Sequence, residues 1–141
     1  MESIEAIRKF FNKDKFATDM GAEIDWVKDG CAGCSLTIAD GHKNAGGSVQ
    51  GGAIFTLADF AFAVAVNWKQ LDTVSLHSDI AYLGAARGDR LTAEAICIKE
   101  GKTTSYYRIE VKDAEDRLVA VVNTTGYRQS AGTAVSGAGE R

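Results

Sequence analysis

The stretch of residues 44–67, NAGGSVQGGAIFTLADFAFAVAVN, restricts the fold of this chain more than any other. After a glycine-rich start, apolar residues recur at the spacing of one helical face, namely Ile54, Leu57, Ala58, Ala61, Phe62 and Ala65. The opposite face is apolar as well, and between residues 54 and 66 only Thr56 and Asp59 are polar. A helix that is apolar on nearly every side is buried, and this one is too short to span a bilayer. The sequence therefore predicts a helix at the centre of the domain.

Asp59 is the residue of this helix that most needs an explanation. On a helical wheel it lies beside Phe55 and Phe62, so its neighbours are apolar. A carboxylate in such surroundings loses hydration unless it is paired or hydrogen-bonded. One interpretation is structural: Asp59 bonds to the backbone or pairs with a cation such as Lys69 or Arg87. The other is that Asp59 is an activated carboxylate beside a cleft, and its position alone leaves both interpretations open.

Length, charge and cysteine content exclude several classes of protein. A chain of 141 residues is long enough for a real core and too short for two domains. The net charge is -3 with both signs interspersed, so no basic stripe is present to bind nucleic acid. Because we find no signal peptide and no apolar run long enough for a bilayer, we expect a cytoplasmic protein that does not bind membranes. Three cysteines, an odd number, do not form a disulfide framework.

The remaining segments predict an α+β domain. Residues 3–16 have an apolar stripe with Ser3 as N-cap, which predicts an N-terminal helix within residues 1–18. Period-two alternation predicts strands over residues 22–27, 34–38, 73–82, 90–99, 103–112 and 118–127. We expect these strands to form a curved antiparallel sheet around the central helix, with the last four in succession. The small, glycine-rich residues 129–141 predict a disordered tail after a single domain of residues 1–128.

Two details concern the first predicted hairpin. By alternation, Ala22, Ile24 and Trp26 are expected on one face of its first strand. Cys31 and Cys34 match C-x-x-C, a spacing found in redox and zinc sites. No second cysteine pair follows, so two small residues beside a hairpin are the better interpretation. A single curved sheet also leaves edges uncovered, and pairing with a second copy would cover them.

The run from His42 to Ala63, HKNAGGSVQGGAIFTLADFAFA, resembles the hot-dog-fold thioesterases of the PaaI type. Members of that family carry an Asn, a spacer, H-G-G, and L-A-D or L-V-D two turns into the central helix. Asn44, the glycine pair and Asp59 keep both the identities and the spacing of that pattern. The resemblance covers nearly the whole domain and continues downstream in residues 73–83, 100–103 and 126–128. It implies the hot-dog fold, a curved antiparallel sheet wrapped around one long central helix.

The resemblance also implies hydrolysis of acyl-CoA thioesters at the interface of a homodimer, with dimers often pairing into tetramers. Asp59 is then the general base or nucleophile, and the backbone N–H of Gly51 or Gly52 polarises the thioester carbonyl. Asn44 would orient the attacking water or the carbonyl, and Ser75 would reach in from the partner subunit. The segments that hold CoA in relatives correspond here to Tyr82, Leu83, Gly84, Arg87, Lys99, Gly101, Lys102, Thr103 and Tyr127. We expect neither a cofactor nor a metal.

The chemistry expected of this glycine-rich helix start agrees with those roles. A helix N-terminus presents free N–H groups and a favourable dipole to a developing oxyanion. Glycine lets a substrate approach the backbone closely. The sequence departs from the family at Gln50, which replaces the His of H-G-G; Gln can hydrogen-bond a carbonyl but cannot titrate. It departs again at residues 84–87, GAAR, where relatives commonly carry Pro and an extra residue.

Two other functions stay open at this point. A non-catalytic acyl-CoA binder is compatible with Gln50. A hot-dog dehydratase or hydratase usually needs a His paired with an acid, and the glycine-rich start and central helix of residues 44–67 contain no D-x-x-x-x-H spacing. Strand alternation places His77 on one face with Ser75 and Asp79, which together with His42 would suggest a metal site. No H-x-x-x-H spacing supports that site, so we expect hydrogen-bonded histidines instead.

Overall fold

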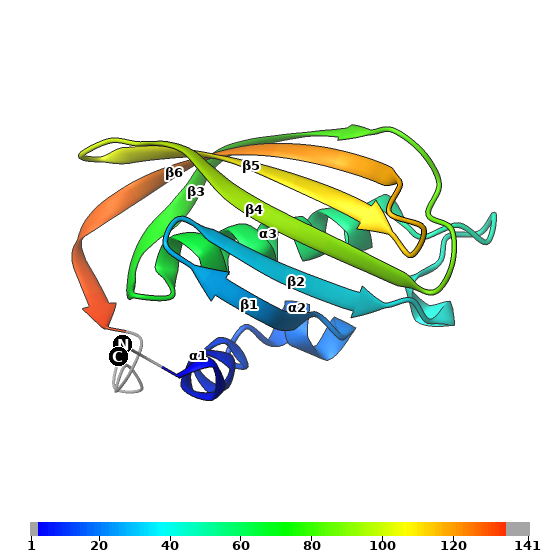
Figure 1. The fold of residues 1–141 in the computed structure, drawn as a ribbon, viewed down its shortest axis with the longest axis horizontal. Coiled ribbons are helices and arrows are strands. Elements are labelled where there is room, and N and C mark those ends of the chain that lie inside the picture. The colour runs from blue at the N-terminus through cyan, green and yellow to red at the C-terminus, as the bar shows by residue number, and fades with distance from the viewer. Residues whose placement is uncertain (1–2, 135–141) are drawn as a thin grey trace.

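One long helix, α3 (Gly51–Asn67), runs inside a curved sheet in the computed structural model, which describes residues 3–134 (Figure 1). It follows a short 3₁₀ helix, η1 (Asp40–His42). The other helices are α1 (Ile4–Phe11) and α2 (Lys15–Met20). The strands are β1 (Glu23–Lys28), β2 (Cys31–Thr37), β3 (Gln70–Tyr82), β4 (Arg90–Glu100), β5 (Thr104–Asp113) and β6 (Leu118–Ala134).

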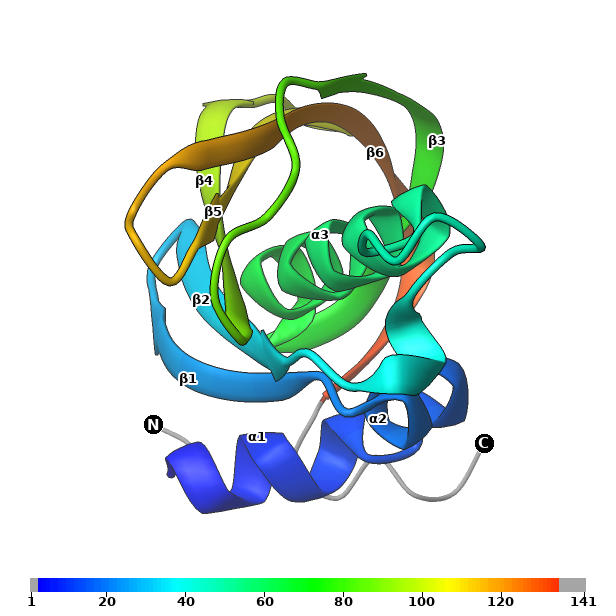
Figure 2. The same ribbon diagram turned by 90° about the vertical axis from the view of Figure 1, so that its right-hand side faces the viewer.

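The strands form a 6-stranded antiparallel sheet in the order β1-β2-β4-β5-β6-β3. The sheet curves around α3, while α1 and α2 lie outside β1 (Figure 2). The α+β architecture predicted from the sequence is therefore confirmed. The predicted succession of the last four strands is wrong in one respect, because β3 lies at the sheet edge and pairs with β6 rather than with β4.

The helix α3 is buried because almost all of its side chains are apolar. It packs mainly against β4 and β2. Four of its residues are 0% exposed, namely Leu57, Ala58, Ala61 and Val64. Full burial of a Leu or Val side chain stabilises a fold by about 1.5–3 kcal/mol. A stripe along one side of the helix stays partly exposed and consists of Phe55, Asp59, Ala63 and Val66. We call it the open stripe of α3.

The N-terminal segment forms two short helices, so the single helix predicted over residues 3–16 is wrong. Ser3 caps α1 as expected, its hydroxyl accepting a hydrogen bond from Ala6 N at 3.1 Å. The chain then turns after Asn12, and Asp14 caps α2 through a 3.3 Å bond from Ala17 N. Asn and Asp side chains compete for backbone hydrogen bonds and favour such caps over a helix interior.

The predicted common face of Ala22, Ile24 and Trp26 is also wrong. Strand β1 carries a bulge between Ile24 and Trp26, which shifts the alternation by one residue. Ile24 is buried in the core, whereas Trp26 lies over Gly33 of β2 so closely that a Cβ at Gly33 would overlap its ring. Glycine at position 33 is what lets the indole lie flat on the outer face of the sheet.

Strand β6 extends further than predicted. We expected the last strand to end near residue 127 and a disordered tail over residues 129–141, but β6 continues to Ala134. Its last residues pair with the start of β3, Thr133 opposite Leu71 and Ala134 opposite Gln70. The rest of the predicted tail lies outside the described residues. The ladder adds backbone hydrogen bonds that a composition-based prediction does not anticipate.

The two edges of the sheet differ in how they are covered. At β1, Arg8 of α1 donates from Nε to Ile24 O at 2.9 Å, and the Trp68 indole donates to Lys28 O at 3.0 Å. At β3, the free side has no partner strand within residues 3–134. Val74 and Leu76 on β3 are 46% and 64% exposed. A long edge strand with exposed apolar side chains is a site where another chain can pair.

Candidate active site

The N-terminus of α3 carries a hydrogen-bond donor without a partner in the described part of the chain, the N–H of Gly51. The next N–H, of Gly52, donates to the Gln50 side-chain oxygen at 2.5 Å, so Gln50 caps its own helix. Tyr82 donates from its hydroxyl to Gly51 O at 3.0 Å. A Cβ at Gly51 would lie 2.9 Å from that hydroxyl oxygen, so a larger residue at position 51 would have to displace the Tyr82 side chain. Gly51 N–H is the group that can donate a hydrogen bond to an oxyanion without rearrangement.

Asn44 closes the loop that leads into α3. Its side-chain oxygen accepts hydrogen bonds from Gly46 N at 3.0 Å and Ser48 N at 3.1 Å. The loop is tied to η1 by a 2.8 Å bond from Gln50 N to His42 O. Asn44 therefore shapes the approach to the helix N-terminus, and its amide nitrogen is the group left to meet a ligand.

Asp59 lies on the open stripe of α3, where Ser75 Oγ donates to its carboxylate at 3.4 Å. The ion pair of Asp59 with Lys69 or Arg87, one form of the structural interpretation, is wrong. Lys69 pairs with Asp29 instead, and the Arg87 guanidinium pairs with Glu115 at 3.8 Å. Burial raises the pKa of the Asp59 carboxyl above its usual range; the Ser75 hydrogen bond opposes this shift. A carboxylate that is partly desolvated and lacks a cation fits the interpretation of an activated group.

The structure bears on two sequence expectations around β3. Ser75 contacts Asp59 of the same chain, so the two side chains belong to one group, and the expected contribution of Ser75 to a partner's site stays a prediction. A bulge between Ser75 and His77 then reverses the alternation, and Ser78 instead lies within 2.8 Å of the buried Thr124 hydroxyl. His77 consequently does not share the face of Ser75. Residues 3–134 contain no cluster of His, Cys, Asp and Glu that could hold a metal.

His42 and the cysteine pair have structural roles. His42 Nε2 lies 2.7 Å from Met20 O, and its Nδ1 accepts from Ala39 N at 3.0 Å, so both ring nitrogens are hydrogen-bonded. Cys34 is buried, and burial raises the pKa of its thiol, which disfavours the reactive thiolate. These contacts fit the structural interpretations of His42 and of C-x-x-C.

The residues expected to hold CoA fall into two groups at opposite ends of α3. The first group follows β3, where Tyr82 contacts the start of α3 and the segment 83–87 continues as an exposed loop. The second is the β4–β5 turn, residues 99–103, with Tyr127 on β6 beside it. In Figure 1 the turn lies at the left end of the molecule and the loop at the right. One chain alone does not bring the two groups together.

Asp113, at the end of β5, holds the first group in place, a role that sequence reasoning missed. Its carboxylate, 4% exposed, accepts hydrogen bonds from Arg87 N at 2.9 Å and from Arg117 Nε at 3.1 Å. Arg117 also donates to Ala85 O at 2.8 Å. Burial raises the pKa of Asp113, but the hydrogen bonds from Arg87, Arg117 and Glu115 outweigh it and hold that pKa well below its usual range. The polar run D-A-E-D-R at residues 113–117 is the sequence feature from which this role could have been predicted.

We expect Asp113→Asn to lower the melting temperature at pH 7 by at least about 4 °C, because the ionised carboxylate binds several donors. A lowered folded-state pKa gives stability that is full above the unfolded value and is lost as pH falls through the folded value. The difference from wild type should therefore shrink below about pH 4. Circular-dichroism melts at pH 7 and pH 3 measure this difference in melting temperature. Asp116→Asn is the control, since among the described residues its exposed carboxylate meets only Lys112, at 3.9 Å. Equal effects of the two changes would contradict the role of Asp113.

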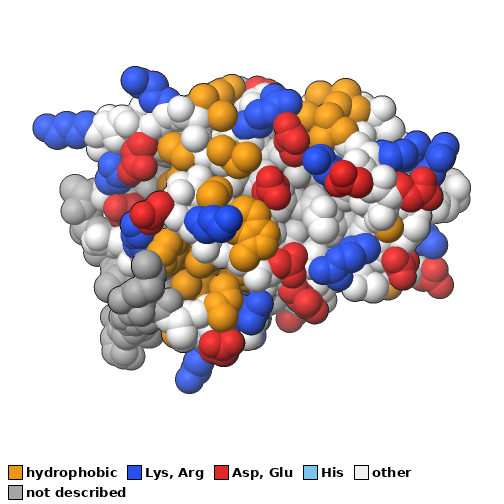
Figure 3. All heavy atoms as spheres, viewed as in Figure 1, with side chains coloured by type: hydrophobic (Ala, Val, Ile, Leu, Met, Phe, Trp, Pro, Cys, Tyr) orange, Lys and Arg blue, Asp and Glu red, His pale blue; other side chains and the backbone are white. Residues whose placement is uncertain are grey.

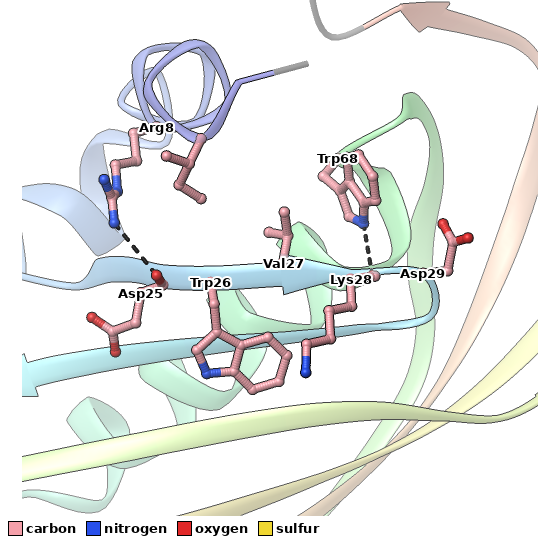
Figure 4. A pocket seen from close by; sticks show the side chains of 8 residues that line it. Arg8, Asp25, Trp26, Val27, Lys28, Asp29 and Trp68 are labelled. Atoms are coloured by element: carbon pink, nitrogen blue, oxygen red, sulfur yellow. Dashed lines mark hydrogen bonds between the residues drawn. The ribbon is translucent and has the colours of Figure 1, made fainter. Parts of the chain in front are cut away.

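A separate cavity of about 540 Å³ lies between α1 and β1, away from Asp59 (Figure 4). Val27 and Trp68 line its apolar part, and Arg8 lies at one end. No nucleophile is paired with a base in it.

Over the face in Figure 3, basic and acidic side chains are interspersed. No described helix is long and apolar enough to cross a membrane.

The curved antiparallel sheet that surrounds a central helix beginning at Gly51 defines the class of protein: it is the hot-dog fold. Residues 46–120 match the family model of the thioesterase superfamily, and the chain belongs to that family.

Individual relatives narrow this class. The chain is 33% identical over 119 residues to the acyl-coenzyme A thioesterase PaaI of Escherichia coli. This alignment covers 84% of this chain and 85% of that protein. The solved structure of the E. coli PaaI protein superposes with a TM-score of 0.84 at 30% identity over 92% of this chain and 94% of that one. A hypothetical thioesterase from Streptococcus pneumoniae, solved with coenzyme A, has a TM-score of 0.73 at 26% identity, and the match covers 85% of this chain and 99% of that one. The PaaI-type resemblance is thus confirmed.

Proposed function

We propose that this protein hydrolyses acyl-CoA thioesters to a free acid and CoA. The observation that carries the proposal is Asp59, a carboxylate with a raised pKa on the open stripe of α3. Among residues 3–134 no cation pairs with it, and the Gly51 N–H at the start of the same helix has no partner there. The relatives support the class of substrate, since one is named an acyl-coenzyme A thioesterase and another was solved with coenzyme A.

The chemistry needs two copies of the chain. Gly51 and Asp59 lie about two turns apart on α3, which is roughly 12 Å along the axis. The Gly51 N–H points beyond the helix N-terminus, away from Asp59. A reacting carbonyl must lie about 3 Å from its nucleophile. A carbonyl held by Gly51 N–H therefore meets Asp59 of a second copy and not of its own chain.

The free edge of β3 is where we place the second copy. A strand that pairs there in a two-fold arrangement runs antiparallel to β3, so the two α3 helices also run in opposite directions. The N-terminus of one helix then lies beside the open stripe of the other. The same arrangement brings the segment 83–87 of one copy toward the β4–β5 turn of the other, which joins the two groups expected to hold CoA. Pairs of such dimers would account for the tetramer expected from the family.

In the proposed reaction the thioester oxygen accepts a hydrogen bond from Gly51 N–H, and from Gly52 N–H once Gln50 turns aside. Asp59 of the second copy either takes a proton from the attacking water or attacks the carbonyl carbon itself, in which case water cleaves the resulting anhydride. In both routes the C–S bond breaks and CoA leaves as a thiolate that takes up a proton. Preorganised N–H groups stabilise the oxyanion that forms on the way.

A non-catalytic acyl-CoA binder is the second candidate, because Gln50 already occupies the Gly52 N–H. Release of free thiol from a panel of acyl-CoAs with different acyl groups separates the two functions. Turnover supports the thioesterase. Tight binding of acyl-CoA by calorimetry without thiol release would overturn it in favour of the binder.

Mixed dimers test the shared site. Asp59→Asn removes the base and Gly51→Val blocks the helix N-terminus, since a side chain there meets Tyr82. If each site uses Asp59 of one copy and Gly51 of the other, refolding the two inactive variants together should restore about a quarter of wild-type activity. Half of the dimers are then mixed, and each holds one intact site of two. No regain, with mixed dimers shown by native mass spectrometry, would contradict a site built from two chains.

A further inference from the structure

The guanidinium of Arg128 on β6 closes the β4–β5 turn. It donates from one terminal nitrogen to Gly101 O at 3.3 Å and Lys102 O at 3.2 Å, and from the other to Glu100 at 2.6 Å. Its Nε lies 3.5 Å from the Asp72 carboxylate. The Arg128 backbone N also donates to Thr103 O at 2.7 Å. A planar guanidinium with fixed donors can hold several acceptors of a turn in one geometry, which a lysine ammonium cannot.

Asp72 is itself held firmly, so Arg128 is fixed from both sides. Thr73 Oγ1 donates to Asp72 at 2.8 Å. Asn67, the last residue of α3, accepts from Asp72 N at 3.2 Å and Thr73 N at 3.0 Å, and it donates to Thr73 O at 2.9 Å. Asn67 is 3% exposed, so these bonds are sheltered from water. Through Arg128, the turn keeps a set position relative to the end of α3.

The turn carries two exposed cations, Lys99 and Lys102, on either side of Glu100. Within residues 3–134 neither ammonium forms an ion pair, whereas the Glu100 carboxylate is bound by Arg128. Without Arg128, Glu100 would be an unpaired anion between the two lysines. It would then compete with any anionic ligand for them.

We propose that Arg128 is a positioning residue that selects for the phosphorylated nucleotide part of CoA. It does so by closing the β4–β5 turn and by neutralising Glu100, so that Lys99 and Lys102 are free to bind phosphate. Arg128 does not touch the reacting atoms. The inference rests on the proposed function, because it takes acyl-CoA as the substrate.

The test compares two substrates with the same acyl group, one on CoA and one on pantetheine, which lacks the phosphates. For Arg128→Gln we expect KM for the acyl-CoA to rise about 10-fold, the effect of losing charge-assisted phosphate contacts. We expect kcat to change less than about 2-fold and KM for the acyl-pantetheine to stay as in wild type. Adding Glu100→Gln to Arg128→Gln should recover most of the lost affinity, since the released carboxylate is then gone.

Arg108→Gln is the matched control, because it removes the same charge from β5, where the Arg108 guanidinium meets only Glu110 within residues 3–134, at 3.1 Å. We expect it to leave both KM values unchanged. Equal increases for both substrates, a matching increase in Arg108→Gln, or a fall in kcat alone would overturn the role of Arg128. Melting curves show whether Arg128→Gln misfolds. If it does, Arg128→Lys, which keeps the charge, replaces it and should give a KM for the acyl-CoA between those of wild type and Arg128→Gln. Absence of thiol release from wild type on either substrate would instead overturn the proposed function.

Discussion

Replacing Asp59 by Asn is expected to lower kcat by at least about 100-fold, because a general base contributes about 10²–10⁴-fold and a covalent nucleophile can contribute more. Asn keeps the shape of Asp59 and can still hydrogen-bond Ser75, but it can neither accept a proton nor form an anhydride. Substrate binding should be largely kept. Steady-state thiol release, with calorimetry for binding, measures both effects. A variant that turns over normally would leave the proposed function without its catalyst.

The stability of the same variant should be equal to or higher than that of wild type at pH 7. Burial raises the folded-state pKa of Asp59, so its ionised form is disfavoured in the folded protein. This penalty is fully present above the folded pKa and absent below the unfolded value, near about pH 3.9. Any gain in melting temperature from Asp59→Asn should therefore disappear as the pH falls to about 3. Thermal melts at the two pH values check the sign, and a variant that melts early at pH 7 would indicate a structural carboxylate.

Replacing Leu76 by Lys is expected to separate the two copies and to lower kcat/KM by about 100-fold or more, since each site then lacks either its base or its oxyanion donor. Leu76 lies on the free edge strand and is 64% exposed in a single chain. Lysine on an edge strand opposes pairing with another strand. Sedimentation at micromolar concentration should show wild type as a dimer or larger and the variant as a 15.0 kDa species.

Ile98→Lys is the control for that experiment. Ile98 is an exposed apolar residue of β4, 57% exposed, and β4 lies inside the sheet rather than at its β3 edge. Both variants should give wild-type circular dichroism, and only Leu76→Lys should lose activity. A 15.0 kDa species that still hydrolyses acyl-CoA would contradict the shared site.

Local pattern was enough to predict most secondary structure. The apolar periodicity of α3 reflects burial on all sides, which depends on the residue types along a single helix. The alternation of β5 likewise predicted the buried face of Tyr107, Ile109 and Val111. The pattern of the candidate site was local as well, since the glycine pair and Asp59 lie on one helix and their spacing is set by its geometry.

Bulges limited the prediction of strand faces. A bulge adds one residue to one strand, so every side chain beyond it moves to the other face. This happened in β1, where Trp26 moved to the outer face, and in β3, where His77 was separated from Ser75. Whether a bulge stabilises or destabilises the sheet depends on the strand that lies opposite. The residue pattern of a single strand contains no information about that partner.

The sequence by itself determined the α+β class, the buried central helix and the Gly51, Gly52 and Asp59 spacing, because each follows from residues close together in the chain. Only the tertiary structure decided that β3 pairs with β6, that Asp113 holds the 83–87 loop and that Arg128 holds the β4–β5 turn. These contacts join residues far apart in sequence. Their strength comes from charge and hydrogen-bond geometry that exists only once the sheet has closed around α3.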